Sequence, residues 1–242
     1  MGHRFADGSW AFRRVDFSVA QREIVVLAGR NGAGKTILAK CLAGLRESTE
    51  GAVLFEGKDL AAYKESPASR VGYVFQDSRL QAVGDTVVDD ASFGPANLGM
   101  NPSEAKSRAE AAIARCGLES RALSFVHTLS GGESRRLAVA GIVAMGPLVV
   151  ILDEPFANLD RDGVRSVLEI IVDLAQGGTA IVVVTHELEK VLGIAARLDI
   201  MDGGSIAASG TPVEVLATGI ERYGLRDPLR PNRGVEDLQW LE

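Results

Sequence analysis

The sequence predicts an α/β fold with a mostly parallel core sheet, an antiparallel β subdomain and an inserted helical lobe. Three short runs rich in β-branched residues, at 24–28, 148–152 and 180–184, each precede a stretch with helical patterning. This alternation is typical of βαβ units around a buried parallel sheet. Residues 1–28 and about 50–75 instead show short alternating patterns with turns that contain glycine. These patterns predict the antiparallel sheet that flanks the core.

A helical lobe is predicted between about residues 84 and 146, inserted into the α/β core. The segment NPSEAKSRAEAAIARCGL has Ser103 as its expected N-cap and a glycine near its end. Another helix is expected directly after LSGG at 129–132. We therefore expect one domain over 1–216 that contains this lobe, and a C-terminal tail over 217–242 to which no chemistry is assigned.

The composition is that of an ordinary folded protein and excludes several classes. The 242 residues are 46% apolar and 24% charged, with a net charge of −6. This balance argues against nucleic acid as a partner, because a nucleic-acid binder presents a broad basic face. The longest apolar runs are far shorter than the roughly 20 residues of a membrane-spanning helix, and we expect no secretory signal. Cys41 and Cys116 are expected to be reduced thiols, which is typical of a cytosolic protein.

The sequence GRNGAGKT at 29–36 predicts a phosphate-binding loop. Its glycines let successive backbone N–H groups point into one concavity, where an anion can bind. Lys35 can reach the β and γ phosphates of a nucleotide, and Thr36 can offer its hydroxyl to Mg²⁺. The loop lies between an apolar strand and a helix, which is the context that this motif requires. The residues expected to bind the nucleotide here are Gly29, Arg30, Asn31, Gly32, Ala33, Gly34, Lys35 and Thr36.

Polar residues follow three of the predicted strands. Asp153 and Glu154 follow LVVIL, His186 follows AIVVVT, and Gln76 follows VGYVF. Because ligands bind at the carboxyl ends of parallel strands, we expect these residues near the phosphate loop. Asp153 is expected to hold hydrated Mg²⁺, and Glu154 to take a proton from an attacking water. Gln76 is a candidate ligand of Mg²⁺ or water, although a purely structural role stays open.

A second anion-binding feature lies in HTLSGGESRRL at 127–137. Ser130 and two glycines stand directly before an amphipathic helix, which prepares a helix N-terminus to hold an anion. The phosphate loop already supplies one such site, and one core sheet has room for one triphosphate. This feature therefore serves either another phosphate or the phosphate of another molecule.

Six motifs, taken in order, resemble those of the nucleotide-binding subunit of ABC transporters. They are the loop 29–36, Gln76, LSGGE at 129–133, LVVILDEP at 148–155, NLD at 158–160 and His186. The resemblance extends to about residue 216. It implies a P-loop NTPase ABC ATPase fold that uses ATP and Mg²⁺, and an ATPase in which two chains sandwich two ATP molecules head to tail.

The resemblance implies a role for each matching residue. Lys35, Thr36 and the backbone amides of 30–36 would bind the phosphates. Gln76 and Thr36 would ligate Mg²⁺, and Asp153 would support the ion.

Other matching residues would act in hydrolysis or across the subunit interface. Glu154 would be the general base, His186 would touch the γ-phosphate, and Asp160 would link the two sites. The signature residues Ser130, Gly131 and Gly132 would contact the γ-phosphate of ATP on the opposite subunit.

The chain departs from the family pattern at two places, and one role has rival candidates. Glu133 stands where the signature usually has glutamine, and Ile37 where a hydroxyl residue is common. Glu133 adds a charge near the partner's nucleotide. By similarity, Phe5 is the expected aromatic that stacks on adenine, with Trp10 and Phe12 as rivals. The remaining histidines, His3 and His127, are expected to be surface or packing residues.

Residues 71–105 resemble the ATPases of energy-coupling factor (ECF) transporters, which import vitamins or transition metals. Phe-Gly-Pro at 93–95, Asn-Leu-Gly at 97–99 and AVAGIVAMGP at 138–147 carry this resemblance. It implies a peripheral protein at the cytoplasmic face of the cell membrane. Its partners would be a second ATPase subunit, a membrane scaffold (T) subunit that docks near the Gln76 loop, and a substrate-binding membrane (S) subunit.

Several points stay open. A homodimer is favoured over a heterodimer with a sister ATPase, because every hydrolytic residue is present in one chain. Biotin is favoured as the imported substrate, followed by cobalt or nickel. An ATPase of another ABC importer or exporter would share the same nucleotide chemistry. A soluble ABC protein acting on nucleic acid or ribosomes is disfavoured by the acidic charge and by the single cassette.

Overall fold

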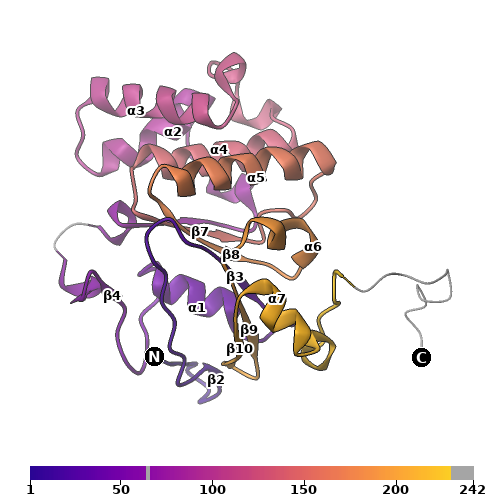
Figure 1. Ribbon diagram of the computed structural model, residues 1–242. Helices are drawn as coiled ribbons and strands as arrows, with labels where there is room; N and C mark the ends of the chain where they lie inside the picture. The colour runs from indigo at the N-terminus through magenta and orange to yellow at the C-terminus, as the bar shows by residue number, and fades with distance from the viewer. Residues whose placement is uncertain (64–65, 230–242) are drawn as a thin grey trace.

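The centre of the molecule is a six-stranded sheet with the order β10-β9-β3-β8-β7-β6. The computed structural model describes residues 1–63 and 66–229, so part of the expected tail, 230–242, lies outside the described residues. Five strands run parallel to their neighbours and β10 pairs antiparallel with β9, which confirms a mostly parallel core (Figure 1). The strands are β3 (Ile24–Ala28), β6 (Val71–Val74), β7 (Val149–Asp153), β8 (Ala180–Val184), β9 (Arg197–Asp202) and β10 (Ser205–Gly210).

Helices cover both faces of this sheet. In Figure 1, α1 lies below the sheet, α4 and α5 lie above it, and α2 and α3 stack on α4 as an outer layer. The longer helices are α1 (Lys35–Leu42), α2 (Val87–Asn97), α3 (Pro102–Arg115), α4 (Gly131–Ala144) and α5 (Arg161–Gln176). Shorter helices are α6 (Leu188–Val191) and α7 (Pro212–Ala217), and 3₁₀ turns span Leu60–Ala62, Pro67–Ser69, Ser78–Gln81, Glu119–Arg121, Val126–Thr128, Leu192–Ile194 and Ile220–Tyr223.

The central strands are apolar along their whole length because both of their faces are covered. Every residue of β3 and β8 is buried. Val26 of β3 belongs to a core cluster with Leu137 of α4 and Ile171 of α5. Its neighbour Leu27 belongs to a second cluster with Leu38 of α1. The strand period of two thus divides β3 between two cores, as expected for a buried parallel strand.

The antiparallel part of the molecule differs from the prediction. Two separate two-stranded ladders form, β1 (His3–Arg4) with β2 (Trp10–Phe12) and β4 (Leu54–Phe55) with β5 (Lys58–Asp59). The assignment of the whole stretch 50–75 to this part was wrong, because β6 joins the core sheet parallel to β7. All residues of β6 are buried. The periodicity of a short apolar run of this kind does not indicate which sheet the strand will join.

The start of α3 also differs from the prediction. The N-cap is Asn101, whose side chain accepts a hydrogen bond from the backbone N–H of Glu104 at 2.9 Å. Pro102 occupies the first helical position, where its fixed φ and its missing N–H are tolerated. Ser103 therefore lies inside the first turn and is not the cap.

Both cysteines are free and buried. Burial raises the pKa of Cys41 to about 11 and that of Cys116 to about 12.

Within residues 1–63 and 66–229, no helix combines the length and apolarity that crossing a bilayer requires.

Candidate functional site

The carboxyl ends of four neighbouring strands meet at one edge of the core sheet, and predicted site residues gather there. The phosphate loop follows β3, Gln76 follows β6, Asp153 ends β7 with Glu154 next to it, and His186 follows β8. These strands are adjacent and parallel, so their carboxyl ends lie along the same edge. The topology therefore assembles one site from four distant parts of the chain.

Two glycines of the phosphate loop are required by close backbone contacts. A Cβ atom at Gly29 would lie 2.2 Å from the carbonyl oxygen of Met201, and one at Gly34 would lie 2.3 Å from the carbonyl oxygen of Ala11. Gly34 also has a left-handed backbone, with φ 99°, as the N-cap of α1. Only glycine fits both requirements, which is why the sequence has glycine here.

Lys35, the first residue of α1, is held within the loop. Its side chain is buried, and Nζ donates to the carbonyl oxygens of Gly29 at 2.7 Å and Arg30 at 3.1 Å. Burial lowers the pKa of the Lys35 amine, while the charges of Glu154 and Asp153 act in the opposite direction. The amine thus lies where a phosphate can replace its contacts with the two carbonyl oxygens.

Asp153 is a buried carboxylate with a partner at each oxygen. Thr36 Oγ1 donates to Oδ1 at 3.3 Å, and the hydroxyl of Tyr73 donates to Oδ2 at 2.6 Å. Burial raises the pKa of Asp153, which the two hydrogen bonds partly offset. Burial, followed by the contact with Asp153, raises the pKa of Tyr73. The oxygen donors of Thr36 and Asp153 suit a hard cation such as Mg²⁺.

Glu154 occupies an unusual backbone position beside these groups. Its φ is 48°, in the left-handed region that few non-glycine residues adopt, and its N–H donates to Val184 at the end of β8. The carboxylate is buried: Oε2 accepts from the Thr185 hydroxyl at 3.0 Å, and Oε1 lies 2.9 Å from Nδ1 of His186. The turn after β7 therefore directs the Glu154 side chain toward β8, where two groups hold it.

The loop that carries Gln76 is tied to α4. Arg135 of α4 is buried; its Nη1 donates to the carbonyl oxygen of Phe75 at 2.9 Å and its Nη2 to that of Gln76 at 2.7 Å. The Gln76 side chain itself is exposed. Burial lowers the pKa of Arg135, with Asp77 and Asp153 opposing it. Neither Arg135 nor Tyr73 could be predicted as a site residue from the sequence, because their partners lie far away in the chain.

The signature residues form the N-terminus of α4 and do not join Lys35. Ser130 is the N-cap, its Oγ accepts from the N–H of Glu133 at 3.2 Å, and Glu133 Oε2 accepts from the N–H of Ser130 at 2.8 Å. This reciprocal pair is a capping box. The N–H of Ser130 is the main cause of the lowered pKa of Glu133, which also pairs with Arg121 at 3.1 Å. Glu133 thus has a structural role that the sequence did not reveal.

The helices that follow the phosphate loop and Ser130 pack on opposite faces of the sheet. α1, which follows the phosphate loop, packs in the lower layer of Figure 1, and α4, which follows Ser130, packs in the upper layer. Ser130 and Gly131 are exposed in the single chain. The signature residues are therefore available to another molecule.

The third part of the predicted site is the start of α5. Asp160 is its N-cap, and Oδ1 accepts from the N–H of Gly163 at 2.8 Å. Asn158 precedes it with a left-handed φ of 60°. The Asp160 carboxylate is exposed, so its capping role leaves it open to solvent.

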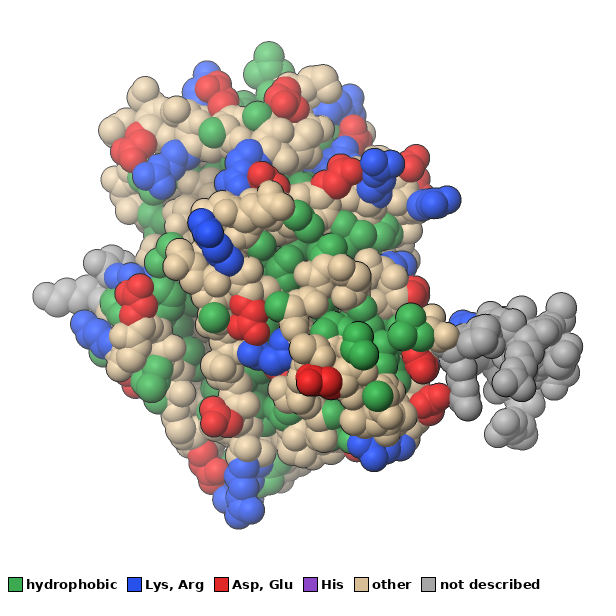
Figure 2. Space-filling model, in the orientation of Figure 1, with side chains coloured by type: hydrophobic (Ala, Val, Ile, Leu, Met, Phe, Trp, Pro, Cys, Tyr) green, Lys and Arg blue, Asp and Glu red, His purple; other side chains and the backbone are tan. Residues whose placement is uncertain are grey.

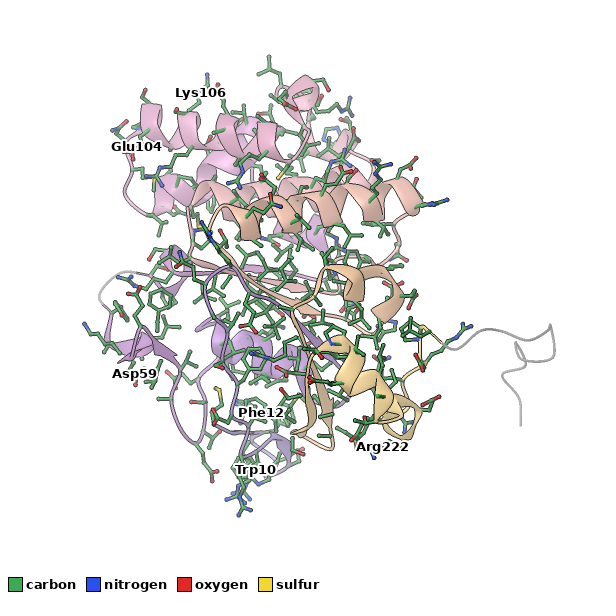
Figure 3. The ribbon with its side chains drawn as sticks, in the orientation of Figure 1. Trp10, Phe12, Asp59, Glu104, Lys106 and Arg222 are labelled. Atoms are coloured by element: carbon green, nitrogen blue, oxygen red, sulfur yellow. The ribbon has the colours of Figure 1, made fainter. Side chains whose placement is uncertain are left out.

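The structure separates the three aromatic candidates for adenine stacking. Phe5 is 39% exposed, whereas Phe12 is fully buried in the core and has no face for a ligand. Trp10 lies near the lower tip of the molecule, apart from the more interior Phe12 (Figure 3). The guanidinium groups of Arg13 and Arg4 lie over the Trp10 ring, at 4.5 and 5.8 Å from its centroid.

The two remaining histidines have different surroundings. His3 is buried, with Nδ1 2.9 Å from the carbonyl oxygen of Glu47 and Nε2 3.1 Å from Nη1 of Arg46. His127 is exposed, and its ring stacks on Phe125. Neither lies at the carboxyl ends of the core strands.

Comparisons with known proteins agree with this geometry. A family model described as ABC transporter matches residues 12–157. The energy-coupling factor transporter ATP-binding protein EcfA of Methanocaldococcus jannaschii is 38% identical over 230 residues, covering 93% of this chain and 82% of that protein. EcfA of Methanosphaera stadtmanae is 36% identical over 216 residues, covering 88% of this chain and 78% of that protein.

A solved structure shows the same fold. The structure of cbiO1 from Clostridium perfringens, described as part of the ABC transporter complex cbiONQ, has a TM-score of 0.81. It is 29% identical in sequence, and the match covers 91% of this chain and 92% of that chain. Three observations agree: the family model matches more than half of the chain, the sequence relatives match over most of it, and the site lies at the ends of the core strands. The chain therefore belongs to the ABC transporter family, as an ATP-binding protein that hydrolyses ATP and has relatives among the energy-coupling factor ATPases.

Proposed function

We propose that this ATPase energises a membrane importer of a micronutrient through an energy-coupling scaffold. One observation carries the catalytic part of the proposal: Lys35, Asp153 and Glu154 meet at one edge of the sheet, buried and with defined partners. The similarity to EcfA proteins over most of the chain supports the transport part.

ATP would bind with its phosphates on the loop that follows β3. The backbone amides of 30–36 would surround the phosphates, and Lys35 would exchange its contacts with Gly29 and Arg30 for contacts with phosphate oxygens. Phe5 would stack on adenine, which its exposure supports. The buried Phe12 has no part in this step.

The donor set beside Lys35 fits Mg²⁺. Thr36 and Gln76 would ligate the ion through a hydroxyl and an amide oxygen, and Asp153 would support it as the buried carboxylate. When bound, Mg²⁺ neutralises charge on the phosphates during phosphoryl transfer. Thr36 and Asp153 are already 3.3 Å apart, so the proposed arrangement needs little movement of these two side chains.

Glu154 would act as the general base for the attacking water. The Thr185 hydroxyl occupies Oε2, so Oε1 is the oxygen that would accept the proton. In the single chain this oxygen lies beside Nδ1 of His186, whose side chain is 55% exposed. His186 would leave this contact to touch the γ-phosphate, which would free Oε1 for the water.

The working unit would be a dimer with two composite sites. Ser130, Gly131 and Gly132 begin a helix on the opposite face from α1, and we propose that they reach the γ-phosphate of ATP bound to a second subunit, with the charge of Glu133 near that nucleotide. Asp160 would link the two sites from the start of α5. A homodimer is favoured because one chain holds every proposed hydrolytic group, and a heterodimer with a sister ATPase is the alternative.

The chain would associate with membrane proteins as a peripheral subunit on the cytoplasmic face. A scaffold (T) subunit would dock near the Gln76 loop, and a substrate-binding (S) subunit would complete the complex. Figure 2 shows basic and acidic side chains interspersed on the visible face, with apolar side chains between the upper and lower parts of the molecule. This supports protein partners over nucleic acid.

The experiment that tests this proposal is purification of the chain with its membrane partners. Biotin is the favoured cargo, followed by cobalt or nickel, and mass spectrometry and elemental analysis of the purified complex would identify the retained substrate. Co-purification with an unrelated ABC permease would favour another importer or exporter. The chain should appear in membrane fractions only when the scaffold is co-expressed, and membrane binding without any scaffold would contradict the proposed docking.

A further inference from the structure

Tyr73 connects two strands whose ends carry proposed magnesium-site residues. It lies in β6, three residues before Gln76, and its side chain is buried. The neighbouring strand β7 ends at Asp153, and the parallel register pairs Tyr73 with Ile151. The Tyr73 side chain extends beyond its backbone partner, so that its hydroxyl donates to Asp153 Oδ2 at 2.6 Å.

The hydroxyl determines how the Asp153 carboxylate is oriented. Oδ2 is engaged by Tyr73, and Oδ1 faces the hydroxyl of Thr36 at 3.3 Å. Two donors on opposite oxygens leave the carboxylate little freedom to rotate. A carboxylate that is fixed before a cation arrives needs less reorganisation to support it.

The ring of Tyr73 also touches the segment that carries Gln76. It packs against Phe75 in an edge contact, with the ring centroids 4.9 Å apart and an interplanar angle of 64°. The backbone carbonyl of Phe75 is held in turn by Arg135. One side chain therefore supports Asp153 through its hydroxyl and the neighbour of Gln76 through its ring.

We propose that Tyr73 is a positioning residue for the magnesium site, acting on Asp153 through its hydroxyl and on the Gln76 segment through its ring. This inference rests on the proposed role of Asp153 in supporting Mg²⁺. Hydrogen bonds of this kind orient the residues around a metal, and their loss typically weakens metal binding by about 10- to 100-fold. Tyr73 would act through these neighbours and not on the nucleotide itself.

The test removes one oxygen atom and keeps the ring. Tyr73→Phe preserves the shape of the buried side chain and its contact with Phe75, but it loses the donor to Asp153. Tyr63→Phe is the matched control, because the Tyr63 hydroxyl donates to the carbonyl oxygen of Phe55 at 3.0 Å, beside the separate β4–β5 ladder. Mn²⁺ is the probe, and its binding to the full chain with a non-hydrolysable ATP analogue is measured by electron paramagnetic resonance.

We expect Tyr73→Phe to weaken Mn²⁺ binding by about 10-fold, at the lower end of the usual range. Nucleotide binding without metal, measured by fluorescence in the presence of EDTA, should stay within about twofold, because the phosphate loop is untouched. Unchanged nucleotide binding would also show that the variant is folded. Tyr63→Phe should match the native chain in both measurements.

Asp153→Asn separates this inference from the proposal on which it rests. If Asp153→Asn weakens Mn²⁺ binding and Tyr73→Phe does not, Tyr73 has no positioning role, and the proposed magnesium site stands. If neither variant changes Mn²⁺ binding, the proposed role of Asp153 is wrong, and the role of Tyr73 is wrong with it. Equal weakening by Tyr73→Phe and Tyr63→Phe would show a general loss of structure and would also overturn the inference.

Discussion

Arg135 donates from Nη2 to the carbonyl oxygen of Gln76 at 2.7 Å, so the helix that begins with the signature holds the loop that carries this proposed magnesium ligand. Its Nη1 holds Phe75 in the same way. The planar guanidinium fits two successive carbonyl oxygens, whereas an ammonium group is a single point of charge. Within each chain, one buried side chain therefore joins the signature helix α4 to the loop that carries Gln76.

Arg135→Lys should slow ATP hydrolysis by about tenfold, because the loss of one charge-assisted hydrogen bond costs ~1.5 kcal/mol and releases part of the Gln76 loop. Steady-state phosphate release at saturating ATP and Mg²⁺ measures this change. Arg165→Lys is the control, since the Arg165 side chain is 79% exposed and pairs with Glu169 on the surface of α5. An unchanged rate for Arg135→Lys would show that the carbonyl contacts do not position the loop for hydrolysis.

Glu154→Gln should nearly abolish hydrolysis, because loss of a general base typically costs about 10²- to 10⁴-fold. Glutamine keeps the shape of the side chain and can still accept from Thr185, so ATP should bind and a closed dimer should accumulate. Phosphate release and size-exclusion chromatography with ATP measure the two effects. Native turnover in this variant would rule out the proposed role of Glu154.

Mixing two inactive variants tests whether the site is shared between chains. Lys35→Ala damages the phosphate loop of its own chain, and Ser130→Arg damages the signature that would act on the partner's ATP. In a mixed dimer, one interface would keep both an intact Lys35 and an intact Ser130. ATPase activity should therefore recover on mixing, to about half of the native rate per mixed dimer if the two sites turn over independently.

The control for this prediction is direct detection of mixed dimers with two different affinity tags. Mixed dimers that form but hydrolyse ATP no faster than either variant alone would contradict sites in trans, provided that a single intact site turns over.

Glu133→Ala should lower the free energy of unfolding by about 1 kcal/mol, because it removes half of the capping box at the start of α4. Chemical denaturation at neutral pH measures this loss. Glu133→Gln should lose only part of this stability there, since glutamine can also accept from the N–H of Ser130 but lacks the charge of the carboxylate. Equal stability of all three chains would show that the box contributes nothing to folding.

Glu133 should also make the free energy of unfolding depend on pH. The folded pKa of Glu133 lies below the ordinary value of 4.5, chiefly because the Ser130 N–H donates to the carboxylate. Its contribution to stability is therefore fully present above pH 4.5 and is lost as the pH falls through the folded pKa. The stability of the native chain relative to Glu133→Gln should decline over that window. A difference that stays constant with pH would contradict the shift.

The parts of the site that the sequence predicted are those where one local motif determines the geometry. Gly29, Gly34 and Lys35 lie within one short loop, and Asp153 directly ends an apolar strand, so their placement follows from local patterning and from parallel strands sharing an edge. The mostly parallel core followed in the same way from the alternation of apolar runs with helical stretches.

The parts that were missed depend on which strands become neighbours. The Tyr73 hydroxyl meets a residue 80 positions away, and Arg135 meets Phe75 60 positions away. Both contacts depend on the place of β6 beside β7, which the short apolar run of β6 does not reveal. The misassigned N-cap had a different cause, since Asn101 and Ser103 are both good caps, and Pro102 at the first helical position decides between them.

The Arg121 guanidinium beside Glu133 has a consequence for the proposed contact between the signature and the triphosphate bound to a partner. An acid in place of the usual amide would repel an incoming polyanion, but here its negative charge is balanced inside the same chain by an ion pair at 3.1 Å. Positions 121 and 133 thus behave as one electrostatic unit that is neutral overall. A chain with glutamine at 133 would have no acid to pair with Arg121. Loss of Arg121 from this chain would leave the Glu133 carboxylate with the smaller charge interaction with Arg136, at the helix start where the partner's nucleotide is proposed to bind.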